Sequence, residues 1–214
     1  EKDARNFLEL VNMSLPGMME LEFEGMFKAG IFVSIKGEEG GAKKKYALMK
    51  ENGEIKIIGF EFVRRNWSRI AKKTQEKVLE IILKNKDVEK ARNYLKGIIT
   101  DIKNHKIPKE ELILTTKLTK PISEYDSISP HVALAKRLKK KGKLITTGML
   151  IDYIVSKGKG KIGDRAITPE EINPADYDSD YYINNQIIPS VETIFKIFGI
   201  DKKEIIDNHK QNQL

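Results

Sequence analysis

Over the first sixty residues, the spacing of apolar and polar positions predicts one helix and a small antiparallel sheet. Apolar side chains recur at helical spacing from residue 3 to residue 13. From residue 18 to residue 24 apolar and acidic side chains alternate, with Leu21 and Phe23 facing one way, which predicts a half-buried strand. The runs GIFVSIKG, KKKYALM and IKIIGF predict three more strands. The last two flank Asn52-Gly53, which is a strong hairpin signal.

Helical periodicity dominates from residue 66 onward. The run NWSRIAKKTQEKVLEIILKN predicts a long helix with Asn66 as its N-cap. The run DVEKARNYLKGIITDIKNHK predicts a second helix with Asp87 as its N-cap. Because the link between them is short, these two helices should pack as an antiparallel pair.

The remaining residues combine extended segments with helices. Residues 111–119 predict a strand, and Ser129 followed by Pro130 marks the start of a helix that ends at Gly142. Residues 144–162 are extended and rich in turns. A last long helix follows residue 176, with a kink expected near Pro189, and residues 202–207 add one further turn. The elements together predict an α+β fold, with a small sheet and one helix followed by a mainly helical part.

Composition narrows the class of protein. The chain has 214 residues and a formal net charge of +8, which favours a polyanionic partner, either nucleic acid or an anionic membrane face. It has no cysteine, which excludes disulfides and thiolate zinc sites and fits a reducing compartment. No apolar run is long enough to cross a membrane, and no signal peptide is visible. We therefore expect no membrane partner and a cytoplasmic protein.

Positive charge is concentrated between His131 and Arg165, where ten lysines and arginines face only two aspartates. Such an excess fits a phosphate backbone, although a solvated helix face would carry the same charges. The candidate phosphate-binding residues in this region are Lys136, Arg137, Lys157, Lys159, Lys161 and Arg165. The run SKGKGK lacks the spacing of a P-loop, so no nucleotide site is predicted there.

Two further groups of charged residues each allow two interpretations. Arg64 and Arg65 directly precede the predicted helix start, where the helix dipole is already positive. An anion such as a DNA phosphate would resolve that conflict, and so would exposure to water. Asp178 and Asp180 have the spacing of paired metal ligands, but acidic residues also stabilise the first turn of a helix, which is the interpretation we favour.

Five ordered segments resemble a known family: LPGMMELEFEGMFKAGIFV, KKKYALM, GFEFVRRNWSRIAKKTQEKVLEIIL, SPHVALAKRL and YYINNQIIPSV. Together they are similar to the C-terminal third of an archaeal family B DNA polymerase. The resemblance covers nearly the full chain, and it implies a nucleoid-associated protein of a prokaryote. It implies that residues 1–63 form the end of the palm domain and residues 64–214 the thumb domain, which grips duplex DNA.

The resemblance also assigns roles to individual residues. In KKKY, Lys44 and Tyr46 match the family's K-x-Y motif, which touches the minor groove of the primer-template just behind the site of nucleotide addition. Correct base pairs present acceptors at nearly the same place in that groove, so a lysine donor there reads pairing geometry and ignores sequence. Strand alternation would place Lys44 and Tyr46 on one face, and Lys43 and Lys45 on the other, toward phosphates or solvent.

The other implied contacts lie at the start and in the body of the thumb. VRRNWS matches the family's palm-to-thumb junction, so Arg64 and Arg65 would hold the primer backbone; Asn66 stands where the family usually has aspartate. The basic cluster would wrap the duplex through its phosphates, and Asn185 is a candidate thumb contact with DNA. At the end of the chain, Gln211 and Leu214 match the start of a sliding-clamp-binding box.

The motifs of polymerase chemistry are missing from this sequence. Neither the palm aspartates in D-x-x-S-L-Y-P and Y-x-D-T-D, nor the fingers helix, nor the exonuclease motifs occur. We therefore expect no catalytic residue, metal site or cofactor in this chain, and Mg²⁺ in the active site of a larger subunit that supplies those parts. A naturally split enzyme is favoured over a fragment, because the apolar side chains of the first sixty residues require a covering surface. A stand-alone basic nucleic-acid-binding module is the alternative function.

Overall fold

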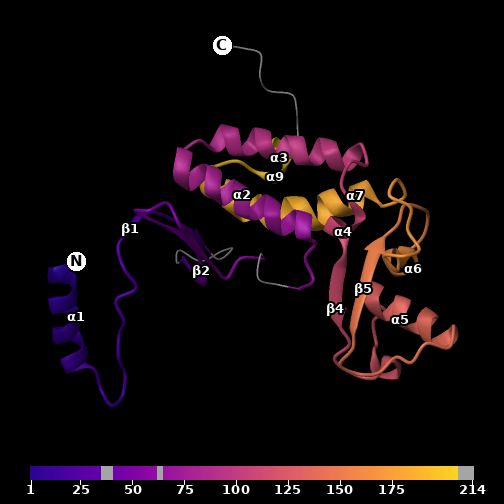
Figure 1. Cartoon of the computed structure of the whole chain (residues 1–214), viewed down its shortest axis with the longest axis horizontal. Coiled ribbons are helices and arrows are strands. Elements are labelled where there is room, and N and C mark those ends of the chain that lie inside the picture. Colours follow the sequence, from indigo (N-terminus) through magenta and orange to yellow (C-terminus); the bar gives the residue numbers. More distant parts are fainter. Residues whose placement is uncertain (35–40, 62–64, 207–214) are drawn as a thin grey trace, which may run out of the picture.

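The computed structural model describes residues 1–34, 41–61 and 65–206. In that part of the chain, helices combine with two three-stranded antiparallel sheets (Figure 1). The helical elements are α1 (Lys2–Ser14), α2 (Arg69–Asn85), α3 (Val88–Lys103), α4 (Lys109–Leu112), η2 (Ile122–Glu124), α5 (Pro130–Lys140), α6 (Ile162–Arg165), α7 (Ser179–Tyr182), η3 (Ile183–Ile187), α8 (Ile188–Ile197) and α9 (Lys202–Ile206). The strands are β1 (Phe27–Ser34), β2 (Gly41–Lys50), β3 (Ile55–Ile58), β4 (Leu114–Lys117), β5 (Leu150–Val155) and β6 (Ala166–Ile167).

The first sheet has the strand order β1-β2-β3. Its β2–β3 turn passes through Asn52-Gly53, as the sequence predicts, and Gly53 adopts a φ of 84°. The inner face of the sheet is apolar because alternate positions of β1 and β2 are buried: Ile31, Val33, Ala47 and Met49. Three of the four predicted strands are therefore confirmed.

The strand predicted around Leu21 and Phe23 is wrong. Residues 19–26 form no regular element, and Leu21 is instead fixed by α1, where the Asn12 amide bonds both its N–H at 2.9 Å and its carbonyl at 3.0 Å. The Arg5 guanidinium lies 4.9 Å from the centre of the Phe23 ring. Alternation of apolar and acidic residues gave the right spacing, but among the residues that the structure describes no neighbouring strand completes a ladder there.

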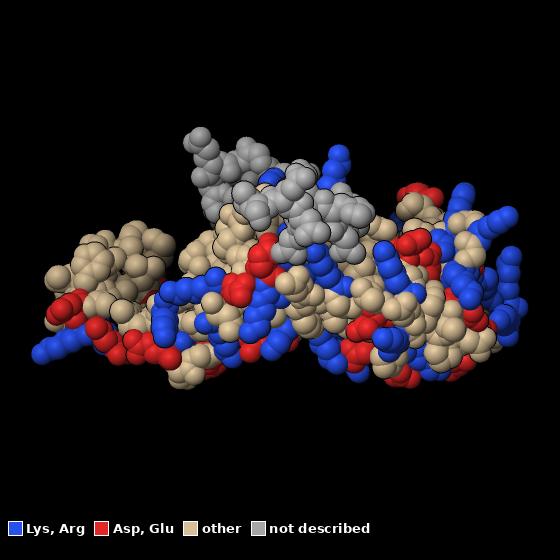
Figure 2. All heavy atoms as spheres, turned by 90° about the horizontal axis from the view of Figure 1, so that it is seen from above, with Lys and Arg blue, Asp and Glu red and all other residues tan. Residues whose placement is uncertain are grey.

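The helix α1 stands apart from the other elements at the N-terminal end of the molecule (Figure 1). None of its residues is buried. The exposed fractions of Phe7, Leu10 and Met13 are 68%, 66% and 82%. Figure 2 shows uncharged residues gathered on the upper side of this end of the molecule, with charged residues along its lower edge.

The predicted antiparallel pair is formed by α2 and α3, which pack against each other. Asp87 caps α3 as predicted, since its Oδ1 accepts a hydrogen bond of 2.8 Å from the Lys90 N–H. The N-cap predicted at Asn66 is wrong, because α2 begins at Arg69 and its N-cap is Ser68. The Ser68 N–H donates to Gln186 Oε1 at 2.9 Å. This hydrogen bond fixes the backbone at Ser68, so the helix begins only after this residue.

The second sheet, with the order β4-β5-β6, lies within the part that the sequence predicts to be mainly helical. The predicted strand at residues 111–119 is present as β4, preceded by the short helix α4. The helix α5 begins at Pro130 with Ser129 as its N-cap, as predicted, and it packs against β5 and α6. In Figure 1, β4 and β5 connect the helix bundle to the end of the molecule that carries α5 and α6.

The last long helix is continuous but irregular. α7 leads into the π-helical turn η3, and α8 follows with Pro189 in its first turn. Since proline has no N–H, the carbonyl of Asn185 four residues earlier has no helical donor there. The π turn thus lies shortly before Pro189, and the kink expected there stays a prediction.

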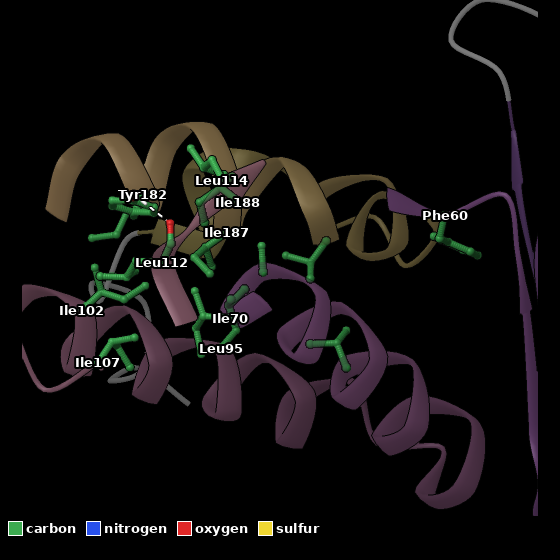
Figure 3. Packing of buried hydrophobic residues seen from close by; sticks show 14 of the residues in the cluster. Phe60, Ile70, Leu95, Ile102, Ile107, Leu112, Leu114, Tyr182, Ile187 and Ile188 are labelled. Carbon is green, nitrogen blue, oxygen red and sulfur yellow. Dashed lines mark hydrogen bonds between the residues drawn. The ribbon is translucent and has the colours of Figure 1, made fainter. Parts of the chain in front are cut away.

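A single cluster of buried apolar residues runs from the first sheet through α2, α3 and α8 to β5. Figure 3 shows its helical part, in which Tyr182 is fully buried and its hydroxyl donates to the Leu112 carbonyl at 2.9 Å. The same hydroxyl accepts a bond of 3.2 Å from the Val155 N–H. Tyr182 therefore ties the final helix to α4 and to the second sheet, which fixes the second sheet to the helix bundle.

Candidate nucleic-acid interface

The strand β2 carries the KKKY segment along the middle of the first sheet. Tyr46 lies opposite Phe32 of β1 and Ile58 of β3. The centres of the Tyr46 and Phe32 rings are 5.9 Å apart, and Phe32 is 64% exposed. The outer face of this sheet therefore presents an aromatic pair, and one of its two members is the predicted DNA-reading residue Tyr46.

Regular alternation breaks down at Lys44. Its φ is 63°, which lies in the left-handed region and interrupts the pleat, and the register with β1 shifts at the same place. Gly59, with a φ of 72°, packs directly against the Lys44 backbone: a Cβ at Gly59 would lie 1.6 Å from the Lys44 carbonyl oxygen. Lys44 is exposed, but a distorted strand places it rather than the even alternation that the sequence predicts.

Lys45 does not face solvent or phosphates, so that prediction is wrong. Strand alternation puts it on the inner face with Ala47 and Met49, where its Nζ lies 3.0 Å from Glu61 Oε1 and 5.2 Å from the centre of the Phe60 ring. Burial raises the pKa of Glu61, but hydrogen bonds from Gln75 and Lys45 outweigh it, so the pKa lies below its ordinary value. The carboxylate is ionised at neutral pH and holds the Lys45 ammonium group.

Three predicted contacts near these elements have different outcomes. The Lys43 side chain and the whole of Arg64 lie outside the described residues. Arg65 is exposed, but it precedes the first residue of α2, Arg69, by four positions. The argument from a positive helix terminus therefore does not apply to Arg65, and its contact with the primer backbone stays a prediction.

Arg137 is tied to the protein interior. It projects from α5, and its Nη1 donates to the carbonyls of Gly163 at 3.1 Å and Asp164 at 3.2 Å. Its Nη2 donates to the carbonyl of Ala166. These bonds hold α6 and the start of β6 against α5.

Arg165 has a similar internal role. It forms an ion pair with Asp178, and its Nη1 also donates to the Ser156 carbonyl at 3.0 Å. The side chains of Arg165 and Asp178 are only 15% and 16% exposed. Asp178 also caps α7, since its Oδ1 accepts from the Tyr181 N–H at 2.9 Å. The aspartate run thus stabilises a helix start, as favoured from the sequence.

The lysines of the loop that follows β5 point to solvent. Lys157 pairs with Asp176 at 2.8 Å, whereas Lys159 and Lys161 are exposed and have no ion-pair partner within the described part of the chain. Lys136 on α5 is half-buried. Figure 2 shows lysine and arginine atoms projecting from this end of the molecule, opposite α1. Of these four lysines, Lys159 and Lys161 are therefore the ones left available to a phosphate backbone, on a loop whose start Arg165 holds through the Ser156 carbonyl.

The remaining predicted sites lie elsewhere. Asn185 is exposed on the π-helical turn η3, away from the lysine loop in sequence. Gln211 and Leu214 fall outside the described residues. Within those residues, no cluster of three histidine, aspartate or glutamate side chains could hold a metal ion, and no helix is long and apolar enough to cross a membrane.

The sequence interpretation missed the inward contacts of Lys45, Glu61 and Gln75. Alternation with Ala47 and Met49 could have placed Lys45 on the inner face. Nothing in the sequence connects position 61 to positions 45 and 75, because they meet only through the packing of the sheet on α2.

The fold is similar to part of a solved polymerase. Its described elements are similar to the solved family B DNA polymerase of the hyperthermophilic archaeon Pyrobaculum calidifontis, with a TM-score of 0.71 and 28% sequence identity over 94% of this chain and 25% of that one. The family model for DNA polymerase family B matches residues 2–198. The chain therefore belongs to DNA polymerase family B.

Archaeal relatives extend the similarity. The chain is 48% identical over 204 residues to a DNA polymerase of Methanocaldococcus jannaschii, and 45% identical over 207 residues to one of Thermococcus gorgonarius. These alignments cover 95% and 96% of this chain but only 12% and 26% of the relatives. The chain thus spans a minor part of the length of the polymerases that it matches.

Proposed function

We propose that this chain is the duplex-gripping part of a DNA-directed DNA polymerase, comprising the end of the palm domain and the thumb domain. It holds primer-template DNA through the minor groove at Lys44 and Tyr46 and through phosphates at the thumb lysines. A larger chain supplies the catalytic aspartates, the fingers and the exonuclease. The observation that carries the proposal is the exposed Lys44 beside Tyr46 on the first sheet, within a chain that matches this family over residues 2–198.

The chemistry of the proposal requires no metal site in this chain. We assign phosphoryl transfer and its Mg²⁺ to the larger chain, because the aspartate motifs that the family uses for this chemistry do not occur in this sequence. The contribution of this chain is to place the duplex. Phosphate contacts set its position, and donors in the minor groove report on the geometry of the last base pairs.

A partner surface is also part of the proposal. Apolar side chains that are more than half exposed gather on α1 and the segment after it: Phe7, Leu10, Met13, Met18, Met19, Leu21 and Met26. Exposed apolar surface of this extent marks an interaction site, and we assign it to the larger chain. A sliding clamp remains a further proposed partner through Gln211 and Leu214.

Primer extension separates this function from that of a stand-alone nucleic-acid-binding module. With Mg²⁺, the chain alone should incorporate no nucleotide, and adding it to the larger chain should restore extension. If the mixture extends primers no better than the larger chain alone, the subunit role is excluded.

Replacing Lys44 tests the minor-groove contact. Lys44→Ala should weaken binding to the primer end about tenfold, because it removes one hydrogen bond from a charged donor. It should also reduce discrimination against mismatched primer ends, with little dependence on sequence. Lys50→Ala, which removes the same charge from the same strand, is the matched control because Lys50 pairs with Glu54 at the hairpin. Equal discrimination in Lys44→Ala and the parent would contradict the role of Lys44.

A further inference from the structure

A chain of polar contacts joins the strand that carries Lys44 and Tyr46 to the helices. The Lys45 ammonium group lies 3.0 Å from Glu61 Oε1. The second carboxylate oxygen, Oε2, accepts a hydrogen bond of 2.8 Å from Gln75 Nε2 on α2. Gln75 Nε2 also donates to the Ser190 carbonyl on α8. Glu61 therefore uses one oxygen for the sheet and the other for the helices.

These contacts are shielded from water. The side chains of Glu61 and Lys45 are 14% and 18% exposed, and Gln75 is fully buried. Hydrogen bonds and ion pairs are stronger in such surroundings, and removing one partner leaves the other charge poorly compensated. The contact between β2 and α2 through Glu61 is consequently stronger than the exposed lysine–glutamate pairs on the surface.

The same short segment also holds the backbone of Lys44. The Cα of Gly59 packs against the Lys44 carbonyl so closely that no Cβ fits, and Glu61 two residues later binds the Lys45 side chain. Residues 59–61 thus fix two successive positions of β2. A residue that reads the minor groove needs such support, because a misplacement of about 1 Å is enough to lose a directed contact.

We propose that Glu61 is a positioning residue for the reading of the primer end: by joining Lys45 to Gln75, it fixes the DNA-facing strand relative to α2 and α8. This inference rests on the proposed function of Lys44 and Tyr46. Glu61 makes no contact with DNA in this arrangement. It determines whether Lys44 and Tyr46, on either side of Lys45, meet the minor groove at the correct distance.

The experiment uses the complete polymerase and two primer-templates, with either adenine or 3-deazaadenine in the last primer pair. The 3-deaza base lacks the minor-groove acceptor N3 but pairs normally. In the parent enzyme, this replacement should weaken primer-end binding about tenfold, as the loss of one charge-assisted hydrogen bond predicts. In Glu61→Gln, the replacement should weaken binding by less than about threefold, because the reading residues no longer reach N3.

Glu54→Gln is the matched control. Glu54 pairs with Lys50 at 2.9 Å on the same hairpin, but its side chain is 59% exposed, and within the described residues it has no ion pair with α2. This variant should keep the full dependence on N3. Gln75→Met interrupts the same chain of contacts from the helix side, so it should reproduce the effect of Glu61→Gln. If one of these two variants proves too unstable to assay, the other provides the test.

Three results decide the matter. A reduced N3 dependence in Glu61→Gln or Gln75→Met, with the dependence intact in Glu54→Gln, supports the positioning role. Weaker binding overall with an undiminished N3 dependence shows that Glu61 only stabilises the fold, which overturns the inference. A parent enzyme that is insensitive to N3 contradicts the proposed function itself, and the parent measurement alone reveals this.

Discussion

At the scale of single residues, close backbone contacts determine where the candidate DNA-reading residues lie. Lys44 occupies the left-handed region with a φ of 63°, which is unfavourable for a residue with a side chain. The surrounding structure must therefore hold it there, and Gly59 is the residue against which its carbonyl packs. Gly59 itself, with a φ of 72°, accepts this arrangement because it has no Cβ.

Gly59→Ala tests this contact. A methyl group 1.6 Å from the Lys44 oxygen must displace the backbone, and the positive φ adds strain, so the variant should lose at least about 2 kcal/mol in the free energy of unfolding. Urea unfolding measures the loss. Gly53→Ala is the control, because Gly53 has a φ of 84° but nothing within 4 Å of the added methyl group, so it should lose about 1 kcal/mol. Equal losses in the two variants would show that the contact with Lys44 is unimportant.

At the scale of elements, two arginines of the basic cluster serve the fold. Arg137 on α5 donates hydrogen bonds to backbone carbonyls of α6 and β6, and Arg165 joins Ser156 to Asp178. The lysines of residues 157–161 therefore project from a loop whose neighbouring segments these two arginines hold in place. Charge alone would have assigned all of these cations to DNA, whereas their surroundings separate bracing arginines from exposed lysines.

Arg165→Met should destabilise the protein by about 3 kcal/mol, since it leaves the Asp178 carboxylate mostly buried without its partner. A thermal or urea unfolding curve measures this. Lys159→Ala is the comparison: stability should hardly change, while the slope of log K against log salt for duplex DNA should fall by about 0.9 if Lys159 neutralises one phosphate. Unchanged stability in Arg165→Met would mean that its ion pair contributes nothing to the fold.

At the scale of the whole molecule, the two ends differ in the kind of side chain that they expose. The α1 end exposes apolar side chains, and the end with α5 and α6 carries projecting cations (Figure 2). The sheet with Lys44 and Tyr46 lies between them in Figure 1. This arrangement suits a chain that docks on the rest of a polymerase at one end and holds a duplex with the remainder.

Phe7→Ser tests the docking surface. Phe7 is 68% exposed, so the folded chain should tolerate the change and keep its unfolding midpoint. Binding to the larger chain should weaken about tenfold or more, since burial of one aromatic side chain contributes roughly 1.5–3 kcal/mol. Titration calorimetry or sedimentation of the mixture measures this, with the exposed Leu144→Ser at the opposite end as the control. Undiminished binding by Phe7→Ser would place the interface elsewhere.

Local signals along the chain determine most of the elements by themselves. The Asn52-Gly53 hairpin, the Asp87 cap and the Ser129-Pro130 helix start depend on neighbouring residues, and all three are present as predicted. The family also follows from the sequence alone, because ordered segments of the chain match motifs of the family. The strand at Leu21 and the cap at Asn66 failed, because each depended on a distant partner: a strand that is not there, and Gln186.

The candidate site divides in the same way. The sequence by itself determined that Lys44 and Tyr46 stand in a strand and that the cations concentrate between residues 131 and 165. Only the tertiary structure decided that Lys45 turns inward to Glu61, that Gly59 holds Lys44 in a left-handed conformation, and that Arg137 and Arg165 face the interior. The physical reason is distance along the chain. Alternation and capping act over a few residues, whereas burial and ion pairing join side chains that only folding brings within 3 Å of each other.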